Sequence, residues 1–332
     1  MNIIFLEASG LNDSVYGKCQ APIRMFLEKR GEDFEKNSVL KNLFLMGKSG
    51  NYADIMTTMT AMSGFEPVGE NGAYPLDGMQ EGYQKLLKYQ TWKDSFSVSK
   101  EMMEDGKLMD MRKQPAAFMT SYNRTRELFG AALYGAAMMG KSTVKFKGLD
   151  FDLKGADGSA LFATAHTPKV SGSKQSNCFS DAFSADALGK METKMHLFRG
   201  DNDEILDVAP DTILIPEIAD LKKTVFAAIG ADKEPTTANN AFNYQYGRWN
   251  VIIWPYLNQF ITAGTSPWVL LDSKYNETYG GAVWNDRIQL EVRSTIDDNT
   301  DANVWRGRSR FNAGFNDWRF AAVGGMTGGS TL

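Results

Sequence analysis

The segment Gly135–Ser142 carries the sharpest chemical pattern in the chain. Its letters, Gly-Ala-Ala-Met-Met-Gly-Lys-Ser, match G-x-x-x-x-G-K-[ST], the loop whose backbone N–H groups and lysine hold nucleotide phosphates. An apolar run that ends in an acid, Trp268–Asp272, has the composition of the strand that would hold a magnesium ion. This pattern alone predicts a nucleoside triphosphatase.

The residues around the pattern argue against that chemistry. A phosphate-binding loop follows a buried strand and begins a helix, so that the N–H groups of the helix start face the phosphates. Here a predicted helix precedes Gly140 and a predicted strand follows Ser142. The C-terminal end of a helix exposes carbonyl oxygens and carries partial negative charge, which repels phosphate. We therefore interpret Gly140 as a helix end and keep a nucleoside triphosphatase as the alternative hypothesis.

Other reactive residues form no complete catalytic or metal-binding set. The only histidines, His166 and His196, lie in a predicted loop and a predicted helix, and no G-x-S-x-G pattern is present. The run 297–301 begins like a calcium loop, but Ala302 replaces the required glycine and Arg308 the bidentate glutamate. The sequence therefore predicts no catalytic, cofactor-binding or metal-binding residues.

Composition narrows the class of protein. The 332 residues are 43% hydrophobic and 23% charged, which excludes a disordered chain, and no apolar run is long enough to cross a membrane. The net charge of −4 argues against nucleic-acid binding by the whole surface. The N-terminus lacks a basic segment, so no secretion signal is predicted, and the two distant cysteines, Cys19 and Cys178, suit the reducing cytoplasm. Abundant Phe, Met and Trp indicate a large contact surface.

The elements that position these residues follow an α+β order without regular βαβ alternation. Pro115 suits the first turn of a long helix that ends at Gly140. Two more helices are predicted, one capped by Ser184 and ending at Gly200, and one after Pro216 that ends at Gly230. Strands are predicted over 144–153, 212–215, 251–254, 268–271, 288–292, 304–311 and 318–323.

The first hundred residues look unable to form a core of their own. The first fifty show short apolar clusters separated by charges, with a basic tilt between Lys18 and Lys48, and no single amphipathic period. From Gly64 the chain is dense in Gly and Pro, and it then becomes β-prone up to about Ser99. We interpret the first part as an arm that packs on another surface, with its basic residues solvated. We interpret the second part as a long, loosely cored hairpin or loop, and loops of this length are usually functional.

This order of segments resembles the major capsid proteins of tailed bacteriophages, particularly the Mu-like major head subunit group with the Hong Kong 97-type fold. The family has an N-terminal arm, an extended β loop (the E-loop), a long spine helix, a peripheral domain and an axial domain. The segments that look similar are Leu161–His166 (Leu-Phe-x-x-x-His), Ala209–Pro216, Trp268–Asp272, Val304–Phe311 and Asp317–Ala321.

The resemblance implies a division of the chain into four units. The N-terminal arm would cover 1–62 and the E-loop 63–100. The peripheral domain would cover 101–175 and 285–325, including the spine helix 115–140, and the axial domain 176–284. The implied function is structural rather than enzymatic, namely a head protein that self-assembles into the icosahedral shell around the phage genome.

The resemblance also implies partners. Other copies of the chain would form hexamers and pentamers of the shell, joined by a portal, a separate scaffolding protein because the arm is short, and a decoration protein. Packaged DNA would bind at most weakly, and no membrane would take part. Assembly is expected in the host cytoplasm, and the product is the virion capsid. The late arginines are expected either to pair across interfaces with Asp297 and Asp298 or to be solvated; they are Arg306, Arg308, Arg310 and Arg319.

Overall fold

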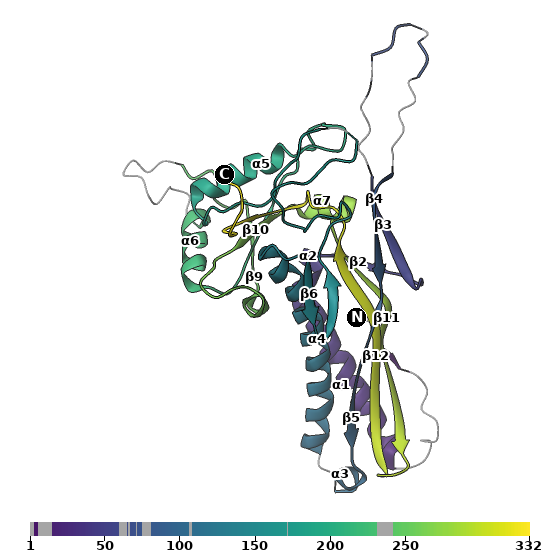
Figure 1. Ribbon diagram of the computed structural model, residues 1–332. Coiled ribbons are helices and arrows are strands. Elements are labelled where there is room, and N and C mark those ends of the chain that lie inside the picture. The colour runs from purple at the N-terminus through teal and green to yellow at the C-terminus, as the bar shows by residue number, and fades with distance from the viewer. Residues whose placement is uncertain are drawn as a thin grey trace.

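The chain folds into a broad body, a narrow stem below it, and a thin hairpin that projects from the end of the body opposite the stem (Figure 1). This computed structural model describes residues 3–5, 15–59, 65, 67–70, 72–74, 81–105, 108–170, 172–230 and 242–332. It contains the mixture of helices and mostly antiparallel sheets that the sequence predicts.

One long antiparallel ladder forms the stem. Its strands β11 (Ala282–Asp297) and β12 (Ala302–Phe315) pair over most of their length, and β5 (Gln90–Val98) pairs with β12 at the edge. Two short strands, β1 (Ile4–Phe5) and β2 (Leu45–Lys48), run parallel to β11. Alternate residues therefore point to opposite faces of the sheet, as the strand period of two requires.

Helices cover one face of this sheet. The spine helix α4 (Leu108–Met138) brings Phe118 and Met119 onto Trp305, and α1 (Val15–Asn37) adds Ile23 and Leu27 to the same buried cluster. The pair Ile23 and Leu27 is one helical turn apart, which places both side chains on one side of α1. The stem is thus a sheet with one apolar face under two helices and one face left to solvent.

The sequence prediction for α4 is wrong at the start of the helix and correct at its end. The predicted start at Pro115 is wrong, because α4 begins at Leu108 and Pro115 lies inside it. Packing of the apolar stripe outweighs the one backbone hydrogen bond that a proline removes. The predicted end at Gly140 is confirmed: Gly140 has a φ of +69°, and its N–H bonds to the carbonyl of Ala137 while that of Lys141 bonds to Ala136. This pair of bonds is the Schellman arrangement.

The first fifty residues contain regular structure that the sequence interpretation missed. The helix α1 covers 23 residues, and the short helix α2 (Leu40–Leu43) follows it. The apolar clusters that suggested an irregular arm are the contact points of these helices, with Leu40, Leu43 and Phe44 in the main core. Tertiary contacts, not a strong helical period, stabilise this segment.

The body holds a second sheet in the order β13-β10-β8-β9. Its strands confirm the predicted apolar runs; they are β8 (Thr212–Ile215), β9 (Asn250–Ile253), β10 (Trp268–Leu271) and β13 (Ala321–Gly324). The helices α5 (Ala185–His196) and α6 (Ala219–Ile229) confirm the predicted positions, and α7 (Ser273–Tyr279) and the 3-10 turn η1 (Pro255–Gln259) complete the body. Ser184 caps α5 as predicted, but this helix ends before Gly200.

The remaining strands form two hairpins. β3 (Ala53–Met59) pairs with β4 (Glu81–Lys88), and β6 (Thr143–Phe146) pairs with β7 (Leu149–Asp152). The short helix α3 (Lys100–Glu104) links β5 to α4. The hairpin expected from Gly64 to about Ser99 is therefore wrong in its strands. β5 lies in the stem sheet, and the first strand of the hairpin begins at Ala53. Pairing partners are long-range choices that local β propensity does not encode.

Candidate assembly surfaces

Between the paired strands β3 and β4, the described residues 65, 67–70 and 72–74 lie beyond the body, at the top of Figure 1. Phe65 and Tyr74 are 109% and 94% exposed, and Val68 is 53% exposed. Large apolar side chains at this exposure are typical of surfaces that bind another protein. Ile55 and Leu86, on the two paired strands, are also exposed.

Hydrogen bonds at the base of the hairpin fix the direction in which it projects. The Lys85 ammonium is largely buried and donates to the backbone carbonyls of Asp152 and Lys154. Lys169 donates to the carbonyl of Gly82 at 2.6 Å, and its ammonium lies 5.8 Å from the ring centre of Tyr83. Burial lowers the pKa of Lys85, although the nearby Asp152 opposes this effect. The hairpin is therefore anchored to the body from two sides.

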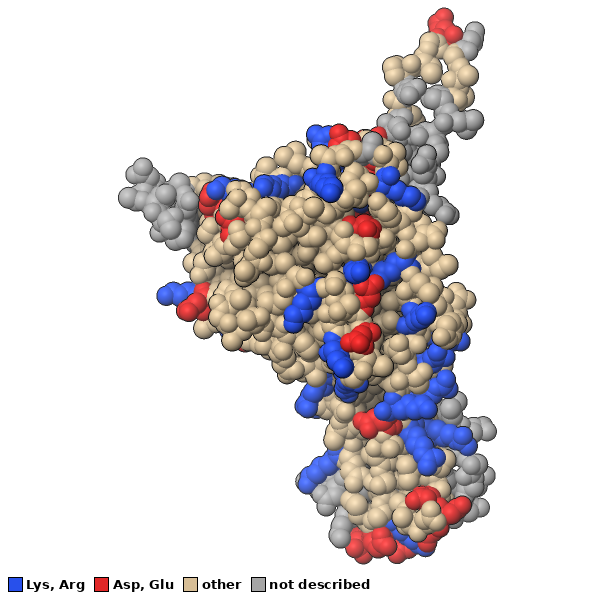
Figure 2. Space-filling view, in the orientation of Figure 1, with Lys and Arg blue, Asp and Glu red and all other residues tan. Residues whose placement is uncertain are grey.

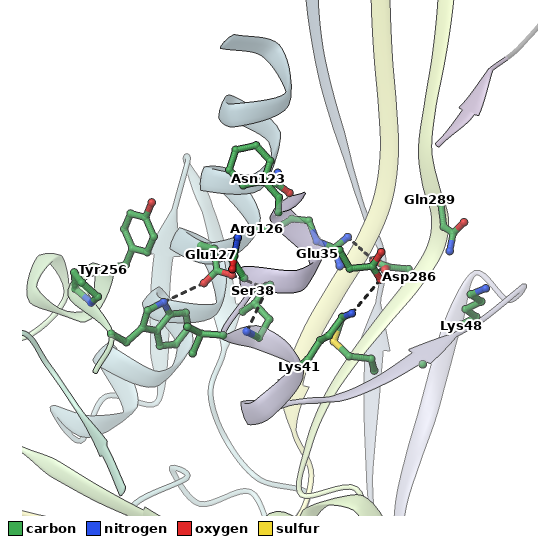
Figure 3. Close-up of a pocket in the computed structure, with 18 residues that line it drawn as sticks. Glu35, Ser38, Lys41, Lys48, Asn123, Arg126, Glu127, Tyr256, Asp286 and Gln289 are labelled. Carbon is green, nitrogen blue, oxygen red and sulfur yellow. Dashed lines mark hydrogen bonds and ion pairs between the residues drawn. The ribbon is translucent and has the colours of Figure 1, made fainter. Parts of the chain in front are cut away.

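A second set of polar contacts joins the N-terminal helices, the spine helix and the body around a cavity of about 390 Å³ (Figure 3). Glu127 of α4 accepts from the Ser38 hydroxyl at 2.6 Å and from the Trp254 indole at 3.0 Å. Burial raises the pKa of Glu127, while these two hydrogen bonds and Arg126 act in the opposite direction. This carboxylate ties three segments that are distant in sequence.

Its neighbour Arg126 ties α4 to the stem sheet. The guanidinium donates to both oxygens of Asp286 on β11, at 2.9 and 3.1 Å, and lies 4.8 Å from the ring centre of Trp284. Burial would lower the pKa of Arg126, but Tyr122 and Asp286 outweigh it, so the pKa is raised above its usual range and the group stays charged. The sequence contained a signal for this site, because Arg126 interrupts the apolar stripe of the helix.

The residues singled out for nucleotide chemistry lie where the helix-end interpretation placed them. Gly135 is buried inside α4, and the N–H groups of Gly140 and Lys141 are already bonded to the last carbonyls of the helix. They cannot also hold phosphates, and Lys141 is exposed at a helix C-terminus. The geometry of this helix end does not favour a nucleoside triphosphatase.

The two histidines have separate structural surroundings. His166 is buried, with Nδ1 2.7 Å from Asp157, Nε2 3.0 Å from Asn177, and its ring stacked on Trp318. The sequence reading missed Asp157 as its acidic neighbour. His196 is partly exposed and its Nδ1 lies 2.8 Å from Asp207. Nothing in these contacts brings the two histidines into one site.

The structure shows the surroundings of Arg319 and of Asp297, two residues for which the sequence predicted interfacial pairing or solvation. Arg319 is 7% exposed and pairs with Asp201 and Asp317 inside its own subunit, so neither alternative, pairing across an interface or solvation, holds for it. Asp297 forms the turn between β11 and β12, where its carboxylate accepts from Thr300. The run 297–301, which begins like a calcium loop, is therefore a largely exposed turn between two strands.

The other late arginines occupy β12. Arg306 and Arg308 are exposed on the solvent face of the stem, and Arg308 lies 3.8 Å from Glu291. Arg310 is half-buried. Within the described residues no group of three or more His, Cys, Asp or Glu is arranged to hold a metal ion. None of the described helices has the length and apolar character needed to cross a membrane.

Comparison with known proteins identifies the family. A sequence model of the family described as phage capsid protein matches residues 83–324. No curated protein matches the sequence significantly. Among solved structures, the capsid of Ralstonia phage GP4 is similar at a TM-score of 0.50 and 11% identity, over 86% of this chain and 90% of that chain.

Two further structures lie just below that level of similarity. The capsid of Myoviridae phage XM1 has a TM-score of 0.48 at 11% identity, over 86% of this chain and 90% of that chain. The virus-like particle from Pyrococcus furiosus has a TM-score of 0.47 at 9% identity, over 91% and 97%. The similarity to the Ralstonia phage capsid shows the Hong Kong 97-type fold. The family match over most of the chain shows that this chain belongs to the phage capsid protein family and is a structural capsid protein.

Proposed function

We propose that each subunit completes its fold on its neighbours, with the projecting hairpin lying on an adjacent copy in hexamers and pentamers of the shell. One observation supports this most directly, namely the nearly complete exposure of Phe65 and Tyr74 in their own subunit. Leaving such side chains in water is costly, at roughly 25 cal/mol per Å² of apolar surface. A second copy offers the cover because closed symmetric shells reuse one surface many times.

The four units expected from the resemblance are proposed with boundaries adjusted to the strands. The arm would run to about residue 52 and the E-loop would be the hairpin 53–88. The peripheral domain would contain the stem sheet, α3, α4 and β6–β7. The axial domain would contain the second sheet with α5 and α6.

The wider proposal concerns partners and activity. We propose that a portal and a separate scaffolding protein direct assembly in the host cytoplasm, that a decoration protein binds some shells, and that packaged DNA is held at most weakly. We propose that the subunit catalyses no reaction. Membership of the Mu-like subgroup stays a prediction from the sequence resemblance.

Negative-stain microscopy with sedimentation tests the proposal. The purified chain is examined alone and after co-expression with the proteins encoded beside it. Closed shells or curved hexameric sheets are expected, and they should form equally with and without ATP and with Lys141→Ala. A monodisperse monomer or small ring under every condition would contradict the proposal.

A further inference from the structure

We propose that His166 is a buried imidazolium, protonated on both ring nitrogens, and that its charge fastens the base of the hairpin to the C-terminal part of the body. The ring lies between two acceptors, the carboxylate of Asp157 and the amide oxygen of Asn177, at 2.7 and 3.0 Å. Both acceptors come from the irregular stretch between β7 and α5. This inference goes beyond the proposed function and does not depend on assembly of the shell.

The orientation of the Asn177 amide fixes the role of Nε2. The amide nitrogen donates to the backbone carbonyls of Leu161 and Ala321 at 2.9 and 3.0 Å, and the amide oxygen accepts from the N–H of Ala163 at 3.0 Å. The opposite orientation would set the amide oxygen against two carbonyls and the amide nitrogen against an N–H. The oxygen therefore faces His166. Because an amide oxygen only accepts, Nε2 must carry a proton.

The contact with Asp157 requires a second proton. Its Oδ1 accepts from the backbone N–H of Ser159 at 3.1 Å, and its Oδ2 lies 2.7 Å from Nδ1 of His166. Without a proton between them, the lone pairs of Nδ1 and of the carboxylate would face each other at hydrogen-bond distance. The imidazole and the carboxyl group therefore hold two protons between them.

The surroundings place this second proton on the ring rather than on the carboxyl group. The indole of Trp318 stacks on the imidazole of His166, with ring centres 4.2 Å apart and an angle of 10° between the planes, and an aromatic face attracts a cation. The N–H of Ser159 favours the charged form of the Asp157 carboxylate. The result is a buried ion pair in which the other N–H of the ring and the other oxygen of the acid are also bonded, as stability of such a pair requires.

A second cation lies near the ring, and its charge is already matched. The guanidinium of Arg319 is 5.0 Å from the ring centre of Trp318 and pairs with Asp201 and Asp317 at 2.9 and 3.2 Å. It therefore does not force the His166 ring to be neutral. The charged side chains seen on the surface in Figure 2 are screened by water, whereas this imidazole is 1% exposed, so its nearest carboxylate determines its charge.

The ion pair connects the base of the hairpin to the C-terminal part of the body. Burial lowers the pKa of Lys85 on β4, and Asp157 is one of the acids that oppose this effect. The hydroxyl of Tyr83, also on β4, donates to the carbonyl of Thr167 at 3.4 Å, next to His166 in the chain. On its other side the ring rests on the indole between β12 and β13. A neutral ring would set two acceptor atoms against each other and weaken both attachments.

Nitrogen chemical shifts test the charge directly. The chain contains two histidines, so a sample without a histidine tag, labelled with nitrogen-15 in histidine, gives signals from two rings, and His196→Gln assigns them. At about pH 7.5, where an ordinary solvated histidine is neutral, both nitrogens of His166 should have the shift of a protonated nitrogen. Sedimented particles give the same information in solid-state spectra. An unprotonated shift at either nitrogen would overturn the proposal, including the case in which the carboxyl group of Asp157 holds the proton.

Removal of the counter-charge tests whether Asp157 maintains the imidazolium. Asp157→Asn should leave His166 with one unprotonated nitrogen under the same conditions. The matched control is Asp207→Asn, which changes a solvated contact of the same kind: Nδ1 of His196 lies 2.8 Å from Asp207, and the side chain of His196 is 37% exposed. This control should alter only the signals of His196. If Asp157→Asn keeps both nitrogens of His166 protonated, the ion pair is not the source of the charge and the proposal fails.

Hydrogen exchange followed by mass spectrometry tests the fastening. The backbones of His166 and Gln175 bond to each other in both directions, at 2.7 and 3.1 Å. These two amides should exchange roughly fivefold faster or more in Asp157→Asn, because an unsatisfied buried polar group is costly. The peptide that contains Tyr83 should show the same direction of change, and Asp207→Asn should change neither. Unaltered exchange at both sites in Asp157→Asn would overturn the fastening role. If Asp157→Asn does not fold by circular dichroism, the nitrogen shifts of the wild type decide the charge.

Discussion

Replacing Asp286 by asparagine would leave a buried guanidinium without its counter-charge. Arg126 and Asp286 are 7% and 16% exposed in their side chains, and two hydrogen bonds of 2.9 and 3.1 Å join them. The rings of Trp284 and Phe311 lie 4.8 and 5.0 Å from the Arg126 guanidinium carbon, so little water can replace the lost carboxylate. The pair joins the spine helix to β11, the longest strand of the stem.

The expected cost follows from this geometry. A hydrogen bond to a charged group contributes roughly 1.5–3 kcal/mol, and breaking one partner of a buried ion pair costs about 3–5 kcal/mol. We therefore expect Asp286→Asn to lower the free energy of unfolding of the unassembled subunit by about 3–5 kcal/mol. Adding Arg126→Met should recover ~2 kcal/mol, because no charge then stays buried and methionine packs against the same rings.

Urea denaturation followed by far-UV circular dichroism measures these differences, provided that the slope with urea is unchanged between variants. The control is Asp203→Asn, which breaks the 3.2 Å pair with Arg199, whose two side chains are 43% and 48% exposed. It should cost less than about 1 kcal/mol. The reasoning is refuted if Asp286→Asn costs no more than this control, or if the double variant costs as much as the sum of its two single changes.

Three further predictions follow from single groups. Burial raises the pKa of Glu127 in the folded protein above its ordinary 4.5, so its contribution to stability is largest below pH 4.5 and is lost as the pH rises through the pKa of the folded state. The urea midpoint of the wild type minus that of Glu127→Gln should therefore fall as the pH rises through this range. A difference that does not change with pH would contradict the effect. Gly140→Ala should cost about 1–2 kcal/mol in thermal unfolding because φ is +69°, whereas Lys141→Ala should leave the melting temperature unchanged; equal shifts would refute the helix-end role. Burial raises the pKa of Cys178 to about 11, so in a Cys19→Ser chain at pH 8 a maleimide should label it only after urea is added, and rapid labelling of the folded chain would argue against that burial.

The sequence could predict those parts of the fold that rest on local chemistry. Ser184 caps α5 and Gly140 ends α4, because a side-chain acceptor and a left-handed backbone are needed within a few residues of the helix ends. The apolar run 212–215 is a buried strand. The order of such segments along the chain was enough to suggest the capsid family.

The candidate surfaces were predicted less completely. The exposure of the described residues 65, 67–70 and 72–74 agrees with the Gly and Pro content of that stretch. The exposure of Arg306 and Arg308 agrees with their alternation on β12. The sequence could not predict the surroundings of Arg319, because one of the two carboxylates that it pairs with, that of Asp201, is more than a hundred residues away. The same holds for Lys85, whose acceptors lie on β7 and just beyond it.

The sequence by itself therefore determined local features, such as the cap of α5 at Ser184, the end of α4 at Gly140 and the buried strand 212–215. The tertiary structure alone decided that α4 begins before Pro115, that β5 pairs with β12 rather than with the hairpin, and that residues 15–37 form a helix. The physical reason is the range of the interactions. Caps and alternation act over a few residues, whereas strand pairing, buried ion pairs and helix docking depend on surfaces that only the folded chain brings together.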